Sequence, residues 1–357
     1  MNMRSYKPLS LAVLVALAAC SQKNETPATD VAATPDKPVA TVAAPVDLGA
    51  TSTLKVSDLD TSINPCTDLH GFVDNKWLAA NPIPSDHTSW GTFELLDQRS
   101  ENAQKAILEG IAKTKPAAGS LEQLVGDFYA SGMDEAKING TPDTVKLKPY
   151  LDTIDAIKTP DDIASYIDSN YAKGLVDVFG FGGQPDFKNS SMVIGYAFEG
   201  GTNLPEKAYY SDPQYQKIRD AYVAHIAKTL QLGGVSADDA KKQADAVMAI
   251  ETQLAAASLS PVEQRDTKNQ YHMRTVAEAD KITPHFSWEK FFDGIGVKDV
   301  KGFSLAEDKF FSTFDTMLTK TSVDDWKAYL RFHAIDNAAS YLNDDLVTEH
   351  FDFYNKT

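Results

Sequence analysis

Helix-start signals recur along residues 92–343 and constrain the possible folds of this chain more than any other feature. Ser120 and Gln123 form a capping box ahead of the apolar residues Leu124, Phe128 and Met133. Apolar residues between Phe93 and Ile111 recur on roughly one helical face. Thr159-Pro160-Asp161-Asp162 starts another helix, and further helices are expected at about 212–232, 236–258, 275–281, 306–319 and 322–343. The fold class expected is mainly α, a multi-helix lobe.

One stretch, residues 176–199, departs from the helical period. Met192, Ile194, Tyr196 and Phe198 alternate with smaller or polar residues, which predicts a β-hairpin or small sheet. Residues 182–190 are rich in turn-forming types and are expected to connect its strands. The glycine cluster at 180–183 has no basic residue beside it, so it is interpreted as a strand kink or bulge rather than a phosphate cradle.

The first twenty residues have the pattern of an export signal. Arg4 and Lys7 precede an apolar run at 9–19 that is too short to span a bilayer. The run ends in Leu17-Ala18-Ala19-Cys20, which resembles a bacterial lipoprotein box with Cys20 as the lipidated residue. A buried N-terminal helix with an ordinary core cysteine is the alternative. The first interpretation predicts a chain that is exported and anchored through lipid, at the outer membrane facing the periplasm.

The chain is therefore divided into three parts. Residues 1–19 are the signal peptide, and residues 20–56 form a flexible tether rich in Ala, Thr and Pro. Residues 57–357 form the helical region, because aromatic residues and helical periodicity begin near Asp58.

Charge and cysteine content exclude several classes of protein. The chain of 357 residues has a net charge of -16, so nucleic acid is not expected as a partner. Its two cysteines, Cys20 and Cys66, exclude a disulfide scaffold and a zinc site made of cysteine clusters. Lipidation of Cys20 would leave Cys66 as the only free thiol, which is expected to be buried and inert.

Motifs that would identify a reaction centre are missing from the sequence. None of the seven histidines has a second one three or four residues away, and H-E-x-x-H does not occur. There is also no G-x-S-x-G elbow and no phosphate-binding loop. The paired acids 161–162, 238–239 and 324–325 lie where first helical turns favour them, so they are interpreted as capping residues. No catalytic residue and no metal ligand is assigned.

Several motifs nevertheless resemble one family in order and spacing. They are Asn64-Pro65-Cys66-Thr67-Asp68 through Trp77, Asn81-Pro82-Ile83-Pro84, Trp90-Gly91-Thr92-Phe93, Phe181-Gly182-Gly183 with Asp186, Lys188-Asn189-Ser190, Leu204-Pro205 with Tyr209-Tyr210, Arg265-Asp266 with Tyr271, His285 to Trp288, and Trp326 through Leu342. Together they resemble the N-terminal region of the neprilysin and endothelin-converting-enzyme family of zinc metallopeptidases.

This resemblance implies a zinc enzyme that hydrolyses peptides, with peptides as its partners. In the family, the zinc ligands and the general base lie in the C-terminal half, and this chain has no matching residues. The chain is therefore expected to be a substrate-enclosing part that is inactive alone and comes from an apparently truncated enzyme. Ser89 stands where neprilysin has a carboxylate-binding arginine, and Asp74 stands at a neighbouring cysteine position of the family.

Some motif residues admit two interpretations. Trp77, Trp90, Tyr209 and Tyr210 either pack within the lobe or contact substrate, and packing is preferred because aromatic side chains bury large apolar areas. Arg265-Asp266 is interpreted as a structural ion pair or an interlobe contact. The alternative function is a non-catalytic peptide-binding or interaction lipoprotein at the outer membrane. A third hypothesis is association with a separately encoded catalytic half.

Overall fold

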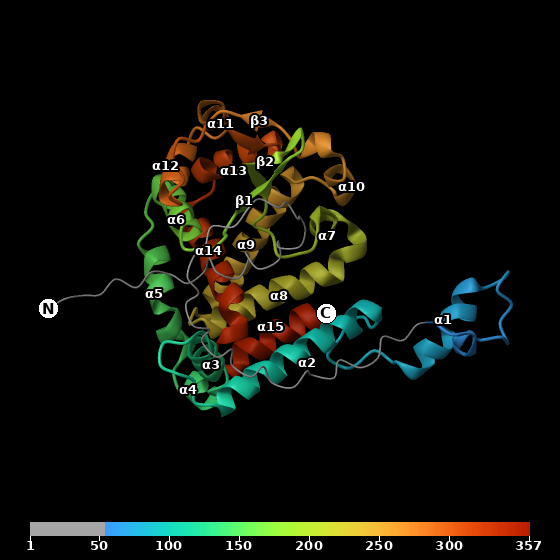
Figure 1. Cartoon of the computed structure of the whole chain (residues 1–357). Coiled ribbons are helices and arrows are strands. Elements are labelled where there is room, and N and C mark those ends of the chain that lie inside the picture. The colour runs from blue at the N-terminus through green and yellow to red at the C-terminus, as the bar shows by residue number, and fades with distance from the viewer. Residues whose placement is uncertain (1–53) are drawn as a thin grey trace, which may run out of the picture. The chain divides into compact units, whose positions relative to one another are not determined.

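The computed structural model describes residues 54–357 (Figure 1). Their fold is mainly α with one small sheet, as predicted. They divide into two compact units: one holds the described residues up to Gly140 with Tyr354–Lys356, and the other holds Thr141–Phe353. The expected signal peptide, Cys20 and the tether up to residue 53 lie outside the described residues.

The first unit consists of one long helix, α2, and several shorter elements. Its elements are η1 (Val56–Asp58), α1 (Leu69–Ala80), α2 (Thr92–Lys113), α3 (Leu121–Gly132) and α4 (Glu135–Asn139). Ser120 caps α3 by accepting a hydrogen bond from the backbone of Gln123 at 3.2 Å. The Gln123 side chain accepts from Gly119 at 2.6 Å, so only half of the expected capping box is present. The expected helix containing Phe93 is confirmed as α2, although Phe93 is 81% exposed.

The second unit contains most of the helices, and several of them begin at the caps that the sequence predicted. Thr159 with Asp162 and Thr275 with Glu278 form complete capping boxes, and Ser236 and Ser322 cap their helices. The helices are α5 (Asp143–Asp155), α6 (Pro160–Tyr171), α7 (Lys207–Ser211), α8 (Gln216–Leu232), α9 (Ala237–Ala257), α10 (Pro261–Gln264), α11 (Val276–Ile282), α12 (Trp288–Gly294), α13 (Asp308–Lys320), α14 (Val323–Ala338) and α15 (Asp344–Lys356), with single 3-10 turns at η2 (Pro213–Tyr215), η3 (Thr267–Asn269) and η4 (Ala339–Tyr341).

The predicted hairpin is confirmed as β1 (Phe179–Asp186) and β2 (Asn189–Glu199), which pair antiparallel. The expected turn at 182–190 was too long, because Gly182 to Pro185 pair within β1 and only two residues connect the strands. The glycine cluster is regular strand, and the irregularity in pairing lies later, between Pro185 and Asp186. Two short strands, β3 (Met273–Arg274) and β4 (Phe303–Leu305), complete a sheet of order β1-β2-β4-β3, with β2 and β4 parallel.

An aromatic core packs against the start of the hairpin. Phe179 is 1% exposed, and five aromatic rings lie with centroids within 6 Å of its own: Phe286, Trp288, Phe291, Phe311 and Phe314. Mixed edge-to-face and tilted geometries suit the ring quadrupoles, and such pairs contribute about 0.5–1.5 kcal/mol beyond burial. This core fixes the sheet against α12 and α13.

Three helices, α8, α9 and α14, pack against one another in the second unit, and Figure 1 shows α8, α9 and α14 as neighbours. Their facing sides carry buried polar residues as well as apolar ones, including His225, Glu251 and Asp336. No helix within residues 54–357 combines the length and the apolar character needed to cross a bilayer.

Candidate functional site

A buried carboxylate on α9 gathers donors from three neighbouring helices. Glu251 is fully buried, and its oxygens accept hydrogen bonds from the hydroxyls of Tyr210 on α7 at 2.6 Å and Tyr222 on α8 at 2.8 Å. Nε2 of His333 on α14 lies 2.9 Å from the same carboxylate. Burial and the charge of Glu251 raise the pKa of Tyr210, so this hydroxyl keeps its proton and donates it.

A second set of contacts continues from this carboxylate toward α15. His225 on α8 places Nε2 3.1 Å from Asp336 and Nδ1 3.0 Å from Glu349. Nδ1 of His350 also lies 3.1 Å from Asp336. The Asn203 side chain donates to Asp336 at 2.9 Å, and its backbone N–H lies 3.4 Å from the carboxylate on α9. We call the nine residues the buried polar network: Asn203, Tyr210, Tyr222, His225, Glu251, His333, Asp336, Glu349 and His350.

The network does not have the arrangement of a zinc site. Zinc needs three or four nitrogen, sulfur or oxygen ligands converging on one point. Both ring nitrogens of His225 instead lie at hydrogen-bond distance from carboxylates. Across the part of the chain that the structure describes, no three His, Cys, Asp or Glu side chains are placed to hold a metal ion. The residues described here therefore do not fit the zinc that the family resemblance implies.

Burial also affects the acids next to the network. Asp177 follows α6, and its carboxylate accepts a hydrogen bond from the Asn170 side chain at 3.1 Å. Burial raises the pKa of Asp177 to about 6, although Asn170 and His333 favour the charged form. The Tyr329 hydroxyl lies 2.8 Å from the Asp177 carbonyl oxygen, which connects α14 to the segment before the hairpin. These contacts serve to fix the packing of the unit.

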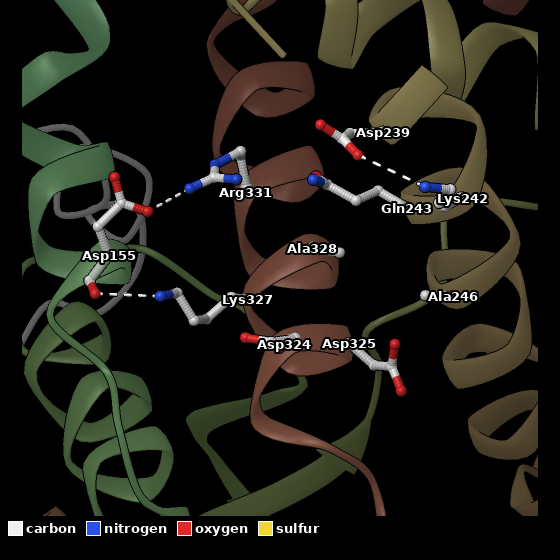
Figure 2. Close-up of a pocket in the computed structure, with 10 residues that line it drawn as sticks. All are labelled: Asp155, Asp239, Lys242, Gln243, Ala246, Asp324, Asp325, Lys327, Ala328 and Arg331. Atoms are coloured by element: carbon white, nitrogen blue, oxygen red, sulfur yellow. Dashed lines mark hydrogen bonds and ion pairs between the residues drawn. The ribbon is translucent and has the colours of Figure 1, made fainter. Parts of the chain in front are cut away.

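A charged pocket of about 430 Å³ opens between α5, α9 and α14 (Figure 2). Arg331 pairs with the Asp155 carboxylate, and Lys327 donates to the Asp155 carbonyl oxygen at 3.1 Å. On the α9 side, Lys242 lies 3.8 Å from Asp239. The other residues that line the pocket are Gln243, Ala246, Asp324, Asp325 and Ala328. The pocket has no nucleophile next to a base, so its side chains suggest surface ion pairing and not catalysis.

The aromatic residues singled out by sequence have different environments. Tyr210 is buried and belongs to the network, which confirms packing for that residue. Tyr209 is partly exposed and stacks on Tyr215 with ring centroids 4.0 Å apart. Trp90 is partly exposed against His87 at 4.7 Å, and Trp77 is also partly exposed. The structure thus places only one of the four in the core.

Two further expectations differ from the structure. Within residues 54–357 Arg265 and Asp266 form no ion pair, because the Asp266 carboxylate instead accepts from the backbone of Lys268 at 3.0 Å, and the alternative of an interlobe contact stays a prediction. Cys66 is exposed and not buried, because it lies in the turn that leads to the Asp68 cap of α1. The predicted lipidation residue, Cys20, lies outside the described residues.

Sequence reasoning missed the buried polar network. Three of the seven histidines that looked scattered meet there, namely His225, His333 and His350. The only local signal was the presence of polar residues within the helical windows expected at 212–232, 236–258 and 322–343, where His225, Glu251, His333 and Asp336 occur. Such residues can also be solvent-exposed, and the helical period alone does not distinguish the two cases.

Comparison with known proteins shows which class of protein has this fold. The crystal structure of the zinc metalloprotease ZMP1 of Mycobacterium tuberculosis, in complex with an inhibitor, aligns with a TM-score of 0.80 at 29% identity over 85% of this chain and 46% of that chain. Neprilysin-3 of Drosophila melanogaster is 26% identical over 67% of this chain and 31% of its own length. Endothelin-converting enzyme 1 of Bos taurus is 23% identical over 81% of this chain and 39% of its own length.

These similarities place the chain among the metallopeptidase families, and it spans less than half the length of these relatives. A family model described as peptidase family M13 matches residues 65–357. The chain belongs to peptidase family M13, and the match is to the N-terminal domain of that family. This confirms the resemblance to the neprilysin and endothelin-converting-enzyme family that the motifs predicted.

Proposed function

We propose that this chain is the substrate-enclosing part of an exported zinc metalloendopeptidase that hydrolyses peptides. The observation that carries the proposal is the family match over residues 65–357, combined with a similarity to ZMP1 that spans 46% of that zinc metalloprotease. In this proposal the zinc and the residues that act on the scissile bond belong to a part of the enzyme outside the described residues. The chain alone is then inactive.

The role proposed for the second unit is to present a wall of fixed shape. Enclosing a peptide excludes bulk water and limits the size of the substrate only if the wall resists local opening. The aromatic core around Phe179 and the buried polar network around Glu251 supply such resistance, because both join helices that are distant in sequence. No bond-breaking step is assigned to any side chain of residues 54–357.

Zinc content and peptide hydrolysis test this proposal together. The purified chain and a version extended through any downstream reading frame are each assayed for bound zinc and for cleavage of a quenched fluorescent peptide. We expect about one zinc and chelator-sensitive cleavage only in the extended protein. Cleavage by this chain alone would contradict the proposal. An extended protein without zinc would favour the alternative, a non-catalytic peptide-binding lipoprotein.

Export and lipid anchoring form a separate part of the proposal. The support is the charged start, the apolar run and the small residues before Cys20 in the sequence. Metabolic labelling with an alkyne fatty acid tests it, with Cys20→Ser as the variant and Cys66→Ser as the matched control. We expect label and outer-membrane fractionation in the wild type and in Cys66→Ser, and neither in Cys20→Ser. Equal labelling of all three proteins would reject Cys20 as the lipidated residue.

A further inference from the structure

Glu199, the last residue of β2, connects the hairpin to the segment that follows α9. One carboxylate oxygen accepts a hydrogen bond from the backbone N–H of Leu259 at 2.6 Å. The other accepts from the side-chain amide of Gln264 on α10, also at 2.6 Å. A single side chain therefore fixes two points of the segment 259–270, which we call the α10 segment.

Glu307, the residue that precedes α13, brings a second carboxyl group to the same place. One of its oxygens lies 3.4 Å from the backbone N–H of Glu199. The other is buried and, within the described residues, has no hydrogen-bond partner if both acids are ionised. The carboxyl group of Glu199 interacts with that of Glu307. A proton held between the two groups would remove the repulsion between two neighbouring negative charges.

The titration behaviour of Glu307 agrees with this geometry. Burial raises its pKa to about 9, and the hydrogen bond to Glu199 and the charge of Glu199 add to the effect. Its position before α13 favours the charged form through the helix dipole, but this contribution is smaller. Glu307 therefore keeps its proton at neutral pH.

Two lysines on the surrounding elements are engaged with other partners. Lys207 donates to the Ser258 carbonyl oxygen at 2.8 Å and lies 3.8 Å from Glu263, and Lys309 donates to the Ala256 carbonyl oxygen at 2.8 Å. Arg274 pairs with Asp308 at 2.6 Å, although its Nε is buried without a hydrogen-bond partner, and the α10 segment itself carries Arg265, Asp266 and Lys268. Within the described residues neither Glu199 nor Glu307 forms an ion pair with a lysine or arginine, so a bound proton is the means of neutralising the pair.

We propose that Glu199 and Glu307 share one proton and form a latch that holds the α10 segment against the sheet, and that loss of this proton opens the latch. A cavity of about 200 Å³ lies beside the pair, lined by Ala197, Phe198, Glu199, Gln264, Gln270, Ala306 and Glu307. This cavity gives water access to the carboxyl groups when the proton leaves. It also provides the volume into which Gln264 and Gln270 can move when the segment detaches.

Limited trypsin digestion measures the opening, because Arg265 and Lys268 are exposed cleavage sites in the α10 segment. Lys298, in the loop after α12 and 76% exposed, serves as an internal control for the pH dependence of trypsin. The measured quantity is the rate of cleavage after Arg265 and Lys268 divided by the rate after Lys298. Opening releases the proton that the closed latch holds, so we expect this ratio in the wild type to rise by up to about tenfold per pH unit between pH 7.5 and about pH 9 and to level off above pH 9.

Two substitutions at position 307 separate the latch from a merely structural contact. Glu307→Gln places a permanent N–H donor where the shared proton lies, so the ratio should stay low and independent of pH. Glu307→Ala removes the donor, so the ratio should be high at both pH 7.5 and pH 10. Glu199→Gln provides a second test if the alanine variant fails to fold. Its amide NH2 replaces one of the two oxygens that accept from Leu259 and Gln264, so the ratio should be high at pH 7.5 and its rise up to pH 9 should disappear.

Two results would overturn the proposal. One is a wild-type ratio that does not change between pH 7.5 and pH 10. The other is a Glu307→Gln or Glu199→Gln variant whose ratio rises as steeply as that of the wild type. Circular dichroism of each protein at both pH values confirms that the digestion reports local opening and not global unfolding.

Discussion

Replacement of Glu251 by leucine tests whether the buried polar network stabilises the second unit. Glu251 is fully buried, and leucine is apolar and of similar size. The change leaves the hydroxyls of Tyr210 and Tyr222 and the ring of His333 without their acceptor. Each of these donors is itself buried, so water cannot replace the lost oxygen at no cost.

The expected loss of stability follows from these contacts. An unsatisfied buried polar group costs about 1–3 kcal/mol, and removing one member of a buried ion pair costs about 3–5 kcal/mol. Since the Tyr hydroxyls can rotate and recover part of this, we expect Glu251→Leu to lower the free energy of unfolding by about 4 kcal/mol. Glu251→Gln keeps one carbonyl oxygen as an acceptor but points an amide donor at another donor, so we expect a loss of about 1–2 kcal/mol.

Guanidinium unfolding followed by tryptophan fluorescence measures these differences. Trp288 and Trp326 are buried in the second unit, whereas Trp77 and Trp90 lie in the first. All variants are therefore made with Trp77→Phe and Trp90→Phe, so that the signal reports the second unit. This restriction matters because a chain of two units need not unfold in a single transition.

The exposed residue Glu289 provides the matched control. Glu289→Gln should change the free energy of unfolding by less than about 0.5 kcal/mol. If Glu251→Leu also stays within about 1 kcal/mol of the wild type, the donors have found other partners. The reasoning that makes this carboxylate the centre of the network would then be wrong.

Three further predictions concern other sites of the described chain. Burial raises the pKa of Asp168 to about 7, so the folded state keeps a proton that the unfolded chain releases near pH 4. The free energy of unfolding should therefore fall as the pH rises from about 4 to about 7. Asp168→Asn should abolish this slope and be more stable than the wild type at pH 8, as measured by thermal melts. Gly201→Ala should destabilise the second unit by about 1–3 kcal/mol, because the residue has φ +74° and a Cβ would lie 2.5 Å from the Tyr329 hydroxyl oxygen. Gly294→Ala, where a Cβ meets no atom within 4 Å, should instead be neutral or stabilising in the same chemical denaturation. Cys66 is exposed, so Ellman's reagent should modify it in the folded chain, and modification only after unfolding would contradict the exposure.

Local features of the fold were predictable because their signals lie within a few residues of one another. The capping boxes Thr159 with Asp162 and Thr275 with Glu278 each span three positions and define where α6 and α11 begin. The alternation from Met192 to Phe198 correctly predicted β2. The turn was placed less accurately, because turn-forming residues such as Gly182 and Pro185 can also pair in an edge strand.

Long-range contacts could not be predicted in the same way. His225 is separated by 111 positions from Asp336 and by 124 positions from Glu349. Glu199 is separated by 108 positions from Glu307. No periodic or capping signal connects residues at such distances. The buried polar network and the contact between Glu199 and Glu307 become visible only once α8, α9, α14 and the sheet have packed together. The resemblance predicted the family without predicting either cluster.

Two of the motifs that indicated the family have structural roles in this chain. In the motif that contains Leu204 and Tyr210, the Leu204 backbone donates to the Tyr210 hydroxyl, which in turn donates to Glu251. In the motif that begins at Trp326, the indole N–H donates to the Met317 carbonyl oxygen at 3.0 Å. These residues hold α7, α9, α13 and α14 together, which is the fixed packing that the proposed enclosing role requires. Substitutions at these motif positions should therefore lower the stability of the second unit. Ser89, in contrast, is exposed on the first unit, where its hydroxyl donates to Glu94 at 2.7 Å, so it can change without disturbing a core.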